Sequence, residues 1–518
     1  MGSKERAAGI LMPISSLPSK YGIGCFSKEA YDFVDKLKEA GQKYWQILPL
    51  GPTGYGDSPY QSFSTFAGNP YFIDPETLIE EELLTRKECD SFDFVSHPQY
   101  VEYEKIYKSR FKMLKIAHKR FQTMDCPEYL QFCSEQAFWL DNYALYMAIK
   151  DSKGSVCWRE WEDDIRLRNF DAVERYKYKL HEEFCFYQFQ QYEFFKQWDK
   201  LKKYANDNGI LIIGDLPIYV ALDSADAWAE PALFQMDENG EPTRVAGCPP
   251  DAFTELGQLW GNPLYNWEYH ENTGYGWWIS RIRNCLRLYD IVRIDHFRGF
   301  DEYYSIPADA ENAKIGRWEK GPGMKLFYRL KEVLGDVNII AEDLGFLTQS
   351  VIDLLKESGY PGMKVLQFAF DESGTNGYLP HNYDNNCVVY TGTHDNATTE
   401  GWYWSLTDKE KDIVNEYLAF NPQYDGRISN RLIRTAMASP ADMAIIPIQD
   451  YLALGNEARC NTPSTLGDNW KWRCKEGFFT DELISYVRRM TELYGRCEIL
   501  RPEPESEESA CEEVEEEK

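Results

Sequence analysis

The most regular feature of this 518-residue chain is a series of short apolar runs separated by polar segments and by glycine and proline. Several runs are almost continuously apolar, such as Ile210-Leu211-Ile212-Ile213. A strand with one face in solvent alternates in polarity, whereas a parallel strand covered on both faces reads as an unbroken apolar run. The pattern therefore predicts eight parallel strands, at residues 9–17, 44–50, 210–220, 290–300, 338–345, 362–370, 387–394 and 443–452.

Helix-like segments lie between many of these strands. Residues 30–40, before the second strand, and residues 324–334, before the fifth, show apolar side chains at three- and four-residue intervals. Eight alternating strands and helices are typical of an α/β fold of the (β/α)₈ TIM-barrel type.

The spacing of the strands is uneven and predicts two insertions. Far more residues separate the second strand from the third than one connecting helix needs. Residues 100–121 and 183–204 within that stretch have helical spacing, while the segment after the third strand is rich in Gly, Pro and Trp. Both insertions follow the carboxyl end of a strand, which is the face that carries active sites in barrel enzymes. The predicted organisation is barrel strands 1 and 2 in residues 1–50, a largely helical insertion in 51–205, strand 3 in 206–220, a loop-rich insertion in 221–288, strands 4–8 with their helices in 289–501, and a disordered acidic tail in 502–518.

Charge and composition exclude some classes of partner. The formal net charge is −28, of which the tail, with nine Glu and one Lys, contributes −8. A surface this acidic repels nucleic acid and anionic membranes, so a neutral partner is expected. Aromatic residues make up 15% of the chain, which fits either a large aromatic core or a cleft whose rings stack on sugars.

The cysteines and the amino-terminal segment indicate a cytoplasmic protein. Thirteen Cys are scattered along the chain without a C-x-x-C pair, which favours reduced thiols. Pro13 interrupts the only apolar stretch near the amino terminus, so no signal peptide is expected. No stretch approaches the 18 apolar residues of a membrane span.

Three of the predicted strands end in a carboxylate. The strings are Arg293-Ile294-Asp295-His296, Ala341-Glu342-Asp343-Leu344 and Thr393-His394-Asp395-Asn396. Barrel enzymes take their catalytic groups from the ends of several strands, and a pair of carboxylates is the minimum for chemistry at a glycosidic bond.

Asp295 is the candidate nucleophile. Arg293 and Arg298 flank it and could hold its carboxylate ionised, which would lower its pKa. Because strand side chains alternate, Arg293 and Asp295 share a face and can pair. A purely structural Arg–Asp pair inside the barrel is an equal alternative from these residues alone.

Glu342 is the candidate acid/base. Partial burial and the neighbouring Asp343 would raise its pKa enough to retain a proton near neutrality. Only one of the two can point into the site, and capping of the next helix suits Asp343 better.

Asp395 with His394 forms the third carboxylate position. A metal site there is not expected, because no second His lies at ligand spacing.

Taken together, these motifs resemble the 4-α-glucanotransferases of the amylomaltase type, glycoside hydrolase family 77 of the α-amylase clan. The resemblance extends from about residue 9 to residue 473. Besides the three strings above, it rests on the segments Tyr55-Gly56-Asp57-Ser58-Pro59-Tyr60-Gln61, Gly214-Asp215-Leu216-Pro217-Ile218-Tyr219-Val220 and Gln258-Leu259-Trp260-Gly261-Asn262-Pro263.

The resemblance implies a role for each matching residue. Asp295 would be the nucleophile, Glu342 the acid/base, and Asp395 the carboxylate that binds sugar hydroxyls in the transition state. It further implies binding of maltooligosaccharides and α-1,4-glucans, with no cofactor, no metal and no C-terminal β-domain. The implied substrate-binding residues are Ser58, Tyr60, Asp251, Gln258, Trp260, Arg293, His296, Phe368 and His394.

The expected activity is transfer of an α-1,4-glucan segment to a 4-hydroxyl of glucose or another glucan, with retention of configuration. An α-1,4-glucan hydrolase on the same scaffold and a non-catalytic glucan-binding protein are the alternatives. The complete set of carboxylates argues against a binder without catalysis, since binding alone does not need them.

Overall fold

The computed structural model describes residues 6–498 except 55, 251–254 and 346. Asp251 and the predicted acidic tail at residues 502–518 therefore lie outside the described residues.

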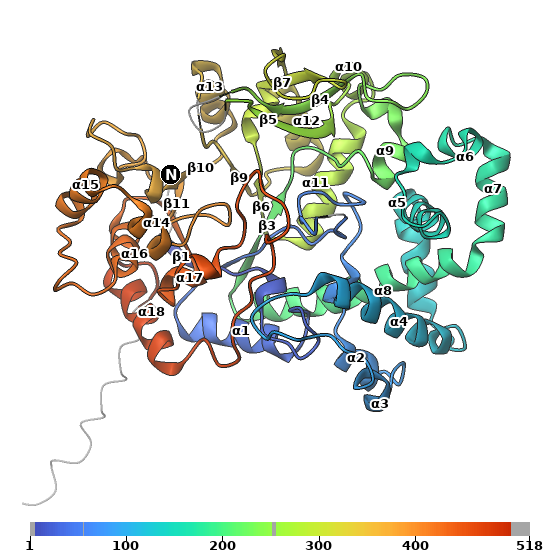
Figure 1. Cartoon of the computed structure of the whole chain (residues 1–518), viewed down its shortest axis with the longest axis horizontal. Coiled ribbons are helices and arrows are strands. Elements are labelled where there is room, and N and C mark those ends of the chain that lie inside the picture. The colour runs from blue at the N-terminus through green and yellow to red at the C-terminus, as the bar shows by residue number, and fades with distance from the viewer. Residues whose placement is uncertain (1–5, 55, 251–254, 346, 499–518) are drawn as a thin grey trace, which may run out of the picture.

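Eight parallel strands form one sheet, in the spatial order β10-β11-β12-β1-β2-β3-β6-β9, and confirm the predicted (β/α)₈ barrel (Figure 1). Seven of the predicted runs contain a barrel strand, and the first, residues 9–17, overlaps β1, which begins two residues earlier; each strand is shorter than its run. The barrel strands are β1 (Ala7–Leu11), β2 (Tyr44–Gln46), β3 (Leu211–Leu216), β6 (Ile291–Ile294), β9 (Ile339–Ala341), β10 (Gly362–Val365), β11 (Cys387–Tyr390) and β12 (Met443–Pro447).

Helices pack around the barrel, and several of them bury one apolar face. α12, for example, buries Leu326, Phe327 and Leu330. The long α8 joins two neighbours: its Tyr204 ring lies 5.1 Å from Tyr31 of α1, and the indole N–H of Trp198 donates to the Leu288 carbonyl at 3.0 Å. The surrounding helices are α1 (Lys28–Glu39), α8 (His181–Asp207), α11 (Gly276–Leu288), α12 (Met324–Leu334), α13 (Gln349–Ser358), α14 (Thr399–Ser405), α15 (Asp408–Leu418), α16 (Ile428–Ala438), α17 (Ile448–Tyr451) and α18 (Asp481–Leu493).

The segment between β2 and β3 is largely helical and projects from one side of the barrel (Figure 1). Its two long helices, α5 and α8, pack against each other through aromatic rings. The Phe195 ring of α8 lies 5.7 Å from Phe132 and 6.0 Å from Trp139 of α5. Besides α8, the segment holds α2 (Pro75–Glu80), α3 (Arg86–Cys89), α4 (Tyr103–Phe121), α5 (Pro127–Ser152), α6 (Asp163–Arg166) and α7 (Phe170–Lys179).

A second, four-stranded antiparallel sheet, in the order β5-β4-β7-β8, lies at the top of Figure 1, and the helical segment lies to its lower right. Only two of its strands belong to the expected insertion after the third barrel strand. The other two follow the fourth barrel strand, where the sequence pattern did not predict them. β8 has little to signal a strand, because it is short and three of its four residues are exposed. The elements of this region are α9 (Ala225–Ala229), β4 (Arg244–Cys248), β5 (Gln258–Pro263), α10 (Trp267–Asn272), β7 (Glu302–Pro307) and β8 (Arg317–Lys320).

A side chain completes the barrel between β9 and β10. The Ala341 N–H donates to the Pro361 carbonyl at 2.9 Å, and two residues further the Asp343 carboxylate accepts the N–H of Met363 at 2.6 Å. Asp343 was expected to cap the next helix. It does not, because α13 begins only after Thr348 and the carboxylate is turned to the neighbouring strand.

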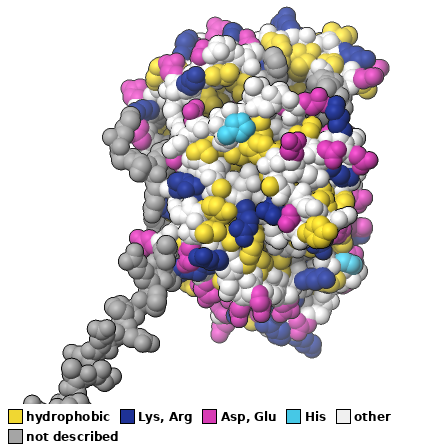
Figure 2. All heavy atoms as spheres, turned by 90° about the vertical axis from the view of Figure 1, so that its left-hand side faces the viewer, with side chains coloured by type: hydrophobic (Ala, Val, Ile, Leu, Met, Phe, Trp, Pro, Cys, Tyr) yellow, Lys and Arg dark blue, Asp and Glu magenta, His cyan; other side chains and the backbone are white. Residues whose placement is uncertain are grey.

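The surface combines charges of both signs. Figure 2 views the side of the molecule formed by α14, α15, α16 and α18, where basic and acidic side chains are interspersed and no continuous basic area is visible.

The twelve cysteines of the described residues are free thiols, half of them buried. Among the described helices, none is long and apolar enough to cross a membrane.

The contact between Asp343 and β10 generates a test of stability. Asp343→Ala should lower the free energy of unfolding by about 1–3 kcal/mol, because the buried N–H of Met363 loses its acceptor. Denaturant titration measures this change, and Asp343→Asn should lose less, since its amide oxygen can still accept. Asp336→Ala, on a side chain that is 89% exposed, is the control. Equal stability of the Asp343→Ala and Asp336→Ala variants would contradict a bracing role for Asp343.

Candidate active site

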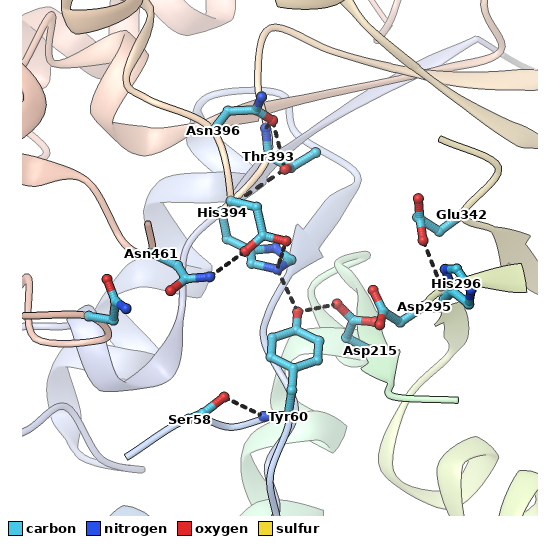
Figure 3. A network of polar contacts seen from close by, with 12 residues as sticks. Ser58, Tyr60, Asp215, Asp295, His296, Glu342, Thr393, His394, Asn396 and Asn461 are labelled. Carbon is cyan, nitrogen blue, oxygen red and sulfur yellow. Dashed lines mark hydrogen bonds and ion pairs between the residues drawn. The ribbon is translucent and has the colours of Figure 1, made fainter. Parts of the chain in front are cut away.

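The carboxyl ends of four barrel strands meet around one group of polar side chains. Asp215 lies in β3, Asp295 follows β6, Glu342 follows β9, and Asp395 comes after β11. Figure 3 shows Asp215 beside Asp295, with Glu342 next to His296 on the other side. The structure therefore brings the three carboxylates of the sequence prediction to one end of the barrel and adds a fourth.

Arg293 links two of these carboxylates. Its Nη1 donates to both oxygens of Asp215, at 2.7 and 2.6 Å, and to Oδ1 of Asp295 at 3.2 Å. The register of the sheet fixes this arrangement, because Asp215 of β3 pairs directly with Arg293 of β6. Both side chains are almost fully buried, so each charge requires the other.

Tyr60 extends the network from Asp215 to His394. The Tyr60 hydroxyl donates to Asp215 at 2.7 Å and lies 2.8 Å from Nε2 of His394, and the two rings stack with centroids 5.2 Å apart (Figure 3). Tyr60 comes from the loop after β2, where its backbone N–H donates to the Ser58 hydroxyl at 3.2 Å. Ser58 therefore shapes the loop that presents Tyr60.

Asp395 is held in its ionised form. Burial opposes ionisation, but His394, whose Nε2 is 3.3 Å from the carboxylate, and the Asn461 amide, which donates at 2.7 Å, outweigh it. Together they hold the pKa of Asp395 below its ordinary value. A guanidinium N–H of Arg459 also donates to the Asp395 carbonyl at 2.8 Å and fixes the backbone there.

Glu342 accepts two backbone hydrogen bonds. Its Oε2 accepts the N–H of His296 at 2.6 Å and its Oε1 that of Leu344 at 3.1 Å. His296 adopts a left-handed backbone with φ 52°, where the chain leaves β6. Burial, followed by the negative charge of Asp295, raises the pKa of Glu342 to about 7. A raised pKa of Glu342 was predicted from the sequence. The negative charge that contributes to it belongs to Asp295, however, and not to the adjacent Asp343.

The pKa of Asp295 differs from the sequence expectation. Burial raises it to about 6, and the charges of Asp215 and Asp395 add to this, although Arg293 lowers it. The lowering expected from Arg293 is present, but burial outweighs it and the charge of Asp215, which also pairs with Arg293, opposes it. Arg298 was also expected to stabilise the ionised Asp295 carboxylate, but its guanidinium lies 3.9 Å over the ring of Trp318.

Three other predicted residues, Gln258, Trp260 and His296, contact one another, and His296 also contacts Glu342. The indole N–H of Trp260 donates to Oε1 of Gln258 at 3.0 Å, and its ring meets the His296 ring edge-to-face at 5.1 Å. Phe368 lies apart in a 3₁₀ turn (Leu366–Phe368), is 45% exposed, and contacts the Tyr378 ring at 5.8 Å. Asp251 lies outside the described residues.

The sequence reasoning did not assign a role to Asp215, Asn461, Arg459 or Trp470. Asp215 carried a usable signal, because it too is a carboxylate at the end of an apolar run. Asn461, Arg459 and Trp470 come from a segment with no strand pattern, and only the fold brings them beside His394 and Tyr60. Among the described residues, no group of three or more His, Cys, Asp or Glu could hold a metal ion.

A (β/α)₈ barrel with a carboxylate cluster at the carboxyl ends of its strands defines a barrel enzyme. The sequence model of the family described as 4-alpha-glucanotransferase, glycoside hydrolase family 77, matches residues 12–480, and the chain belongs to this family.

Similar proteins cover nearly the whole chain. It is 50% identical over 491 residues to a 4-alpha-glucanotransferase of Clostridium butyricum, covering 94% of this chain and 100% of the relative. It is 48% identical over 501 residues to one of Thermus thermophilus, covering 95% and 99%. The solved amylomaltase of Streptococcus agalactiae in complex with acarbose matches with a TM-score of 0.93 and 41% identity, over 95% of this chain and 100% of that one.

The buried pair predicts a large effect on stability. Asp215→Ala should lower the free energy of unfolding by about 3–5 kcal/mol, because it leaves the Arg293 guanidinium buried without its main counter-charge. Asp199→Ala is the matched control: it breaks a half-exposed pair with Arg287 at 2.9 Å and should cost about 0–1 kcal/mol. Denaturant titration of both variants measures the difference, and similar losses would show that the Arg293–Asp215 pair does not stabilise the barrel.

Proposed function

We propose that this enzyme transfers α-1,4-glucan segments to the 4-hydroxyl of glucose or of another α-1,4-glucan by a retaining double displacement. Asp295 is the nucleophile and Glu342 the general acid and base. The observation that carries the proposal is the position of these two carboxylates at the ends of the paired strands β6 and β9, where Glu342 accepts the N–H of His296, the residue after Asp295.

In the first step, the Asp295 carboxylate attacks the anomeric carbon while Glu342 protonates the departing 4-oxygen. The glycosidic bond breaks, a glycosyl ester forms on Asp295, and Glu342 is left ionised. Two carboxylates with separated pKa values suit this division, because one must be ionised when the other holds a proton.

In the second step, Glu342 removes the proton from an acceptor 4-hydroxyl, whose oxygen displaces Asp295 from the anomeric carbon. The two inversions restore the α configuration. An enzyme that cuts one α-1,4 bond and makes another must retain configuration, and this supports the mechanism over a single displacement.

The remaining residues bind the sugar around the reacting carbon. Arg293, His394 and Asp395 supply donors and acceptors for hydroxyls at the cleaved linkage, and Tyr60 offers a ring for stacking. Trp260 and Gln258 are linked to Glu342 through His296, and we place the acceptor sugar against this group. The family resemblance supports Ser58, Phe368 and Asp251 as further substrate contacts. A sugar held by Trp260 is oriented for attack and excludes water, which favours transfer over hydrolysis.

We infer a cytoplasmic location and neutral glucans as the partners. The free thiols of the described residues support a reducing compartment. The net charge of −28 supports an uncharged polymer over a polyanion such as nucleic acid.

Product analysis tests the transfer reaction. Given maltotriose alone, the enzyme should release glucose together with a ladder of longer maltooligosaccharides. The number of reducing ends should stay almost constant, because each transfer breaks one α-1,4 bond and forms another. Chromatography of the products with a parallel reducing-end assay measures both quantities.

Asp295→Asn is the control for that experiment, since it keeps the side-chain shape and removes the nucleophile. It should form no ladder. Steady growth of reducing ends, with only glucose and maltose formed by the unaltered enzyme, would identify a hydrolase instead.

The two pKa values predict a narrow bell-shaped pH profile of kcat/KM. As pH falls through about 6, Asp295 takes up a proton and the nucleophile is lost; as pH rises through about 7, Glu342 loses the proton it must donate. Because the two groups interact, the limbs describe the pair. Maltotriose kinetics across the pH range measure the profile. A flat profile from about pH 5 to pH 9 would contradict the assigned protonation states.

A further inference from the structure

A small cavity lies beside His394. It is bounded by the loop after β11, the start of α17 and the segment at residues 459–460, and His394, Gln449, Arg459 and Cys460 are among its lining residues. Its volume is about 10 Å³, which is about the space that one water molecule needs.

Two buried polar atoms belong to side chains that line this cavity. His394 is 3% exposed and Gln449 is 4% exposed. Neither Nδ1 of His394 nor Oε1 of Gln449 has a hydrogen-bond partner among the described residues. A buried polar atom without a partner costs free energy, and two such atoms at one cavity can be satisfied by one bridging molecule.

The other end of the Gln449 amide is already engaged. Its Nε2 donates to the Ala458 carbonyl at 3.2 Å and to Sγ of Cys460 at 3.1 Å. These two bonds fix the orientation of the amide, so the acceptor that remains available is Oε1. The Gln449 side chain is therefore held as an acceptor at the cavity.

The opposite nitrogen of His394 is committed to the active site. Because Asp215 accepts from the Tyr60 hydroxyl, the Tyr60 oxygen must accept at its contact with His394, so Nε2 carries a proton. Nδ1 is then the position at which His394 gains or loses its second proton. The charges that face the ring are Asp395 and Asp215, which favour the imidazolium, and Arg293, which opposes it. Arg459 and Asp450 border the cavity, and the Asp450 carboxylate accepts from the Thr391 hydroxyl at 2.5 Å and from the Thr399 N–H at 2.8 Å.

We propose that one water molecule occupies this cavity and bridges Nδ1 of His394 to Oε1 of Gln449, which makes Gln449 a positioning residue for His394 and Asp395. When the imidazole is neutral, the water donates to both atoms. When it is charged, the water accepts from Nδ1–H and donates to Gln449. The ring thus keeps a hydrogen bond on both sides in either state, and the contacts of Nε2 with Tyr60 and Asp395 are undisturbed.

Titration of His394 in two variants tests this assignment. In Gln449→Leu the water loses its second partner and a charged Nδ1–H would be buried without an acceptor, so the pKa of His394 should fall by about one unit. In Gln449→Glu the acceptor is retained with a negative charge, so the pKa should rise. Imidazole ¹⁵N shifts of histidine-labelled protein measure both, with the resonance assigned from His394→Gln; the chain has seven histidines.

Gln42→Leu is the matched control. Gln42 is 5% exposed, donates through Nε2 to the Ala40 carbonyl at 3.1 Å, and has an Oε1 without a partner among the described residues. It lies outside the site, so its replacement should leave the His394 titration unchanged. Opposite shifts in the two Gln449 variants are not expected from a general loss of packing.

Shifts in the same direction, or none, would overturn the proposal. A high-resolution crystal structure of the unaltered enzyme gives a second test that does not depend on the stability of any variant. It should show ordered density within hydrogen-bonding distance of both Nδ1 and Oε1, and clear absence of that density would also overturn the proposal. Neither experiment depends on the reaction that the enzyme catalyses.

Discussion

The active site depends on a guanidinium that is buried at the carboxyl end of the barrel. Arg293 cannot remain there without a counter-charge, and the pairing of β3 with β6 places Asp215 directly opposite it. Asp215 in turn accepts from Tyr60, and Tyr60 contacts His394. The ion pair is therefore the point from which loops after β2 and β11, far apart in sequence, are oriented toward Asp295.

Burial and charge act in opposite directions on the carboxylates of this site, and the balance differs for each. Asp395 contacts His394 and Asn461, which hold its pKa below the ordinary value, so it stays ionised. Asp295 shares its arginine with Asp215, so burial prevails and its pKa rises. Glu342 has only backbone donors and a negative neighbour, and its pKa rises further. Residues of nearly the same chemistry thus acquire three different protonation behaviours from their neighbours.

The barrel strands and the three carboxylates were predictable because both leave local signals: continuous apolar runs and acidic residues at their ends. The contacts of Asp215, Asn461 and Arg298 were not, because each depends on a partner from a distant segment. β8 escaped prediction because a short, exposed strand is defined by its pairing with β7 and not by its own pattern. The direction of the pKa shift of Asp295 also depends on a distant segment, because Asp215, which binds the same arginine, adds to the increase that burial causes.

The junction between β9 and β10 has a consequence for how this enzyme can change. The side chain that completes the barrel there, Asp343, is the immediate neighbour of Glu342. Any local opening of this junction would displace the Glu342 carboxylate along with the strand that carries it. The stability of the barrel and the proton transfer that we propose for Glu342 therefore depend on two adjacent residues, so selection for a looser or a tighter barrel at this position would act on that chemistry at the same time.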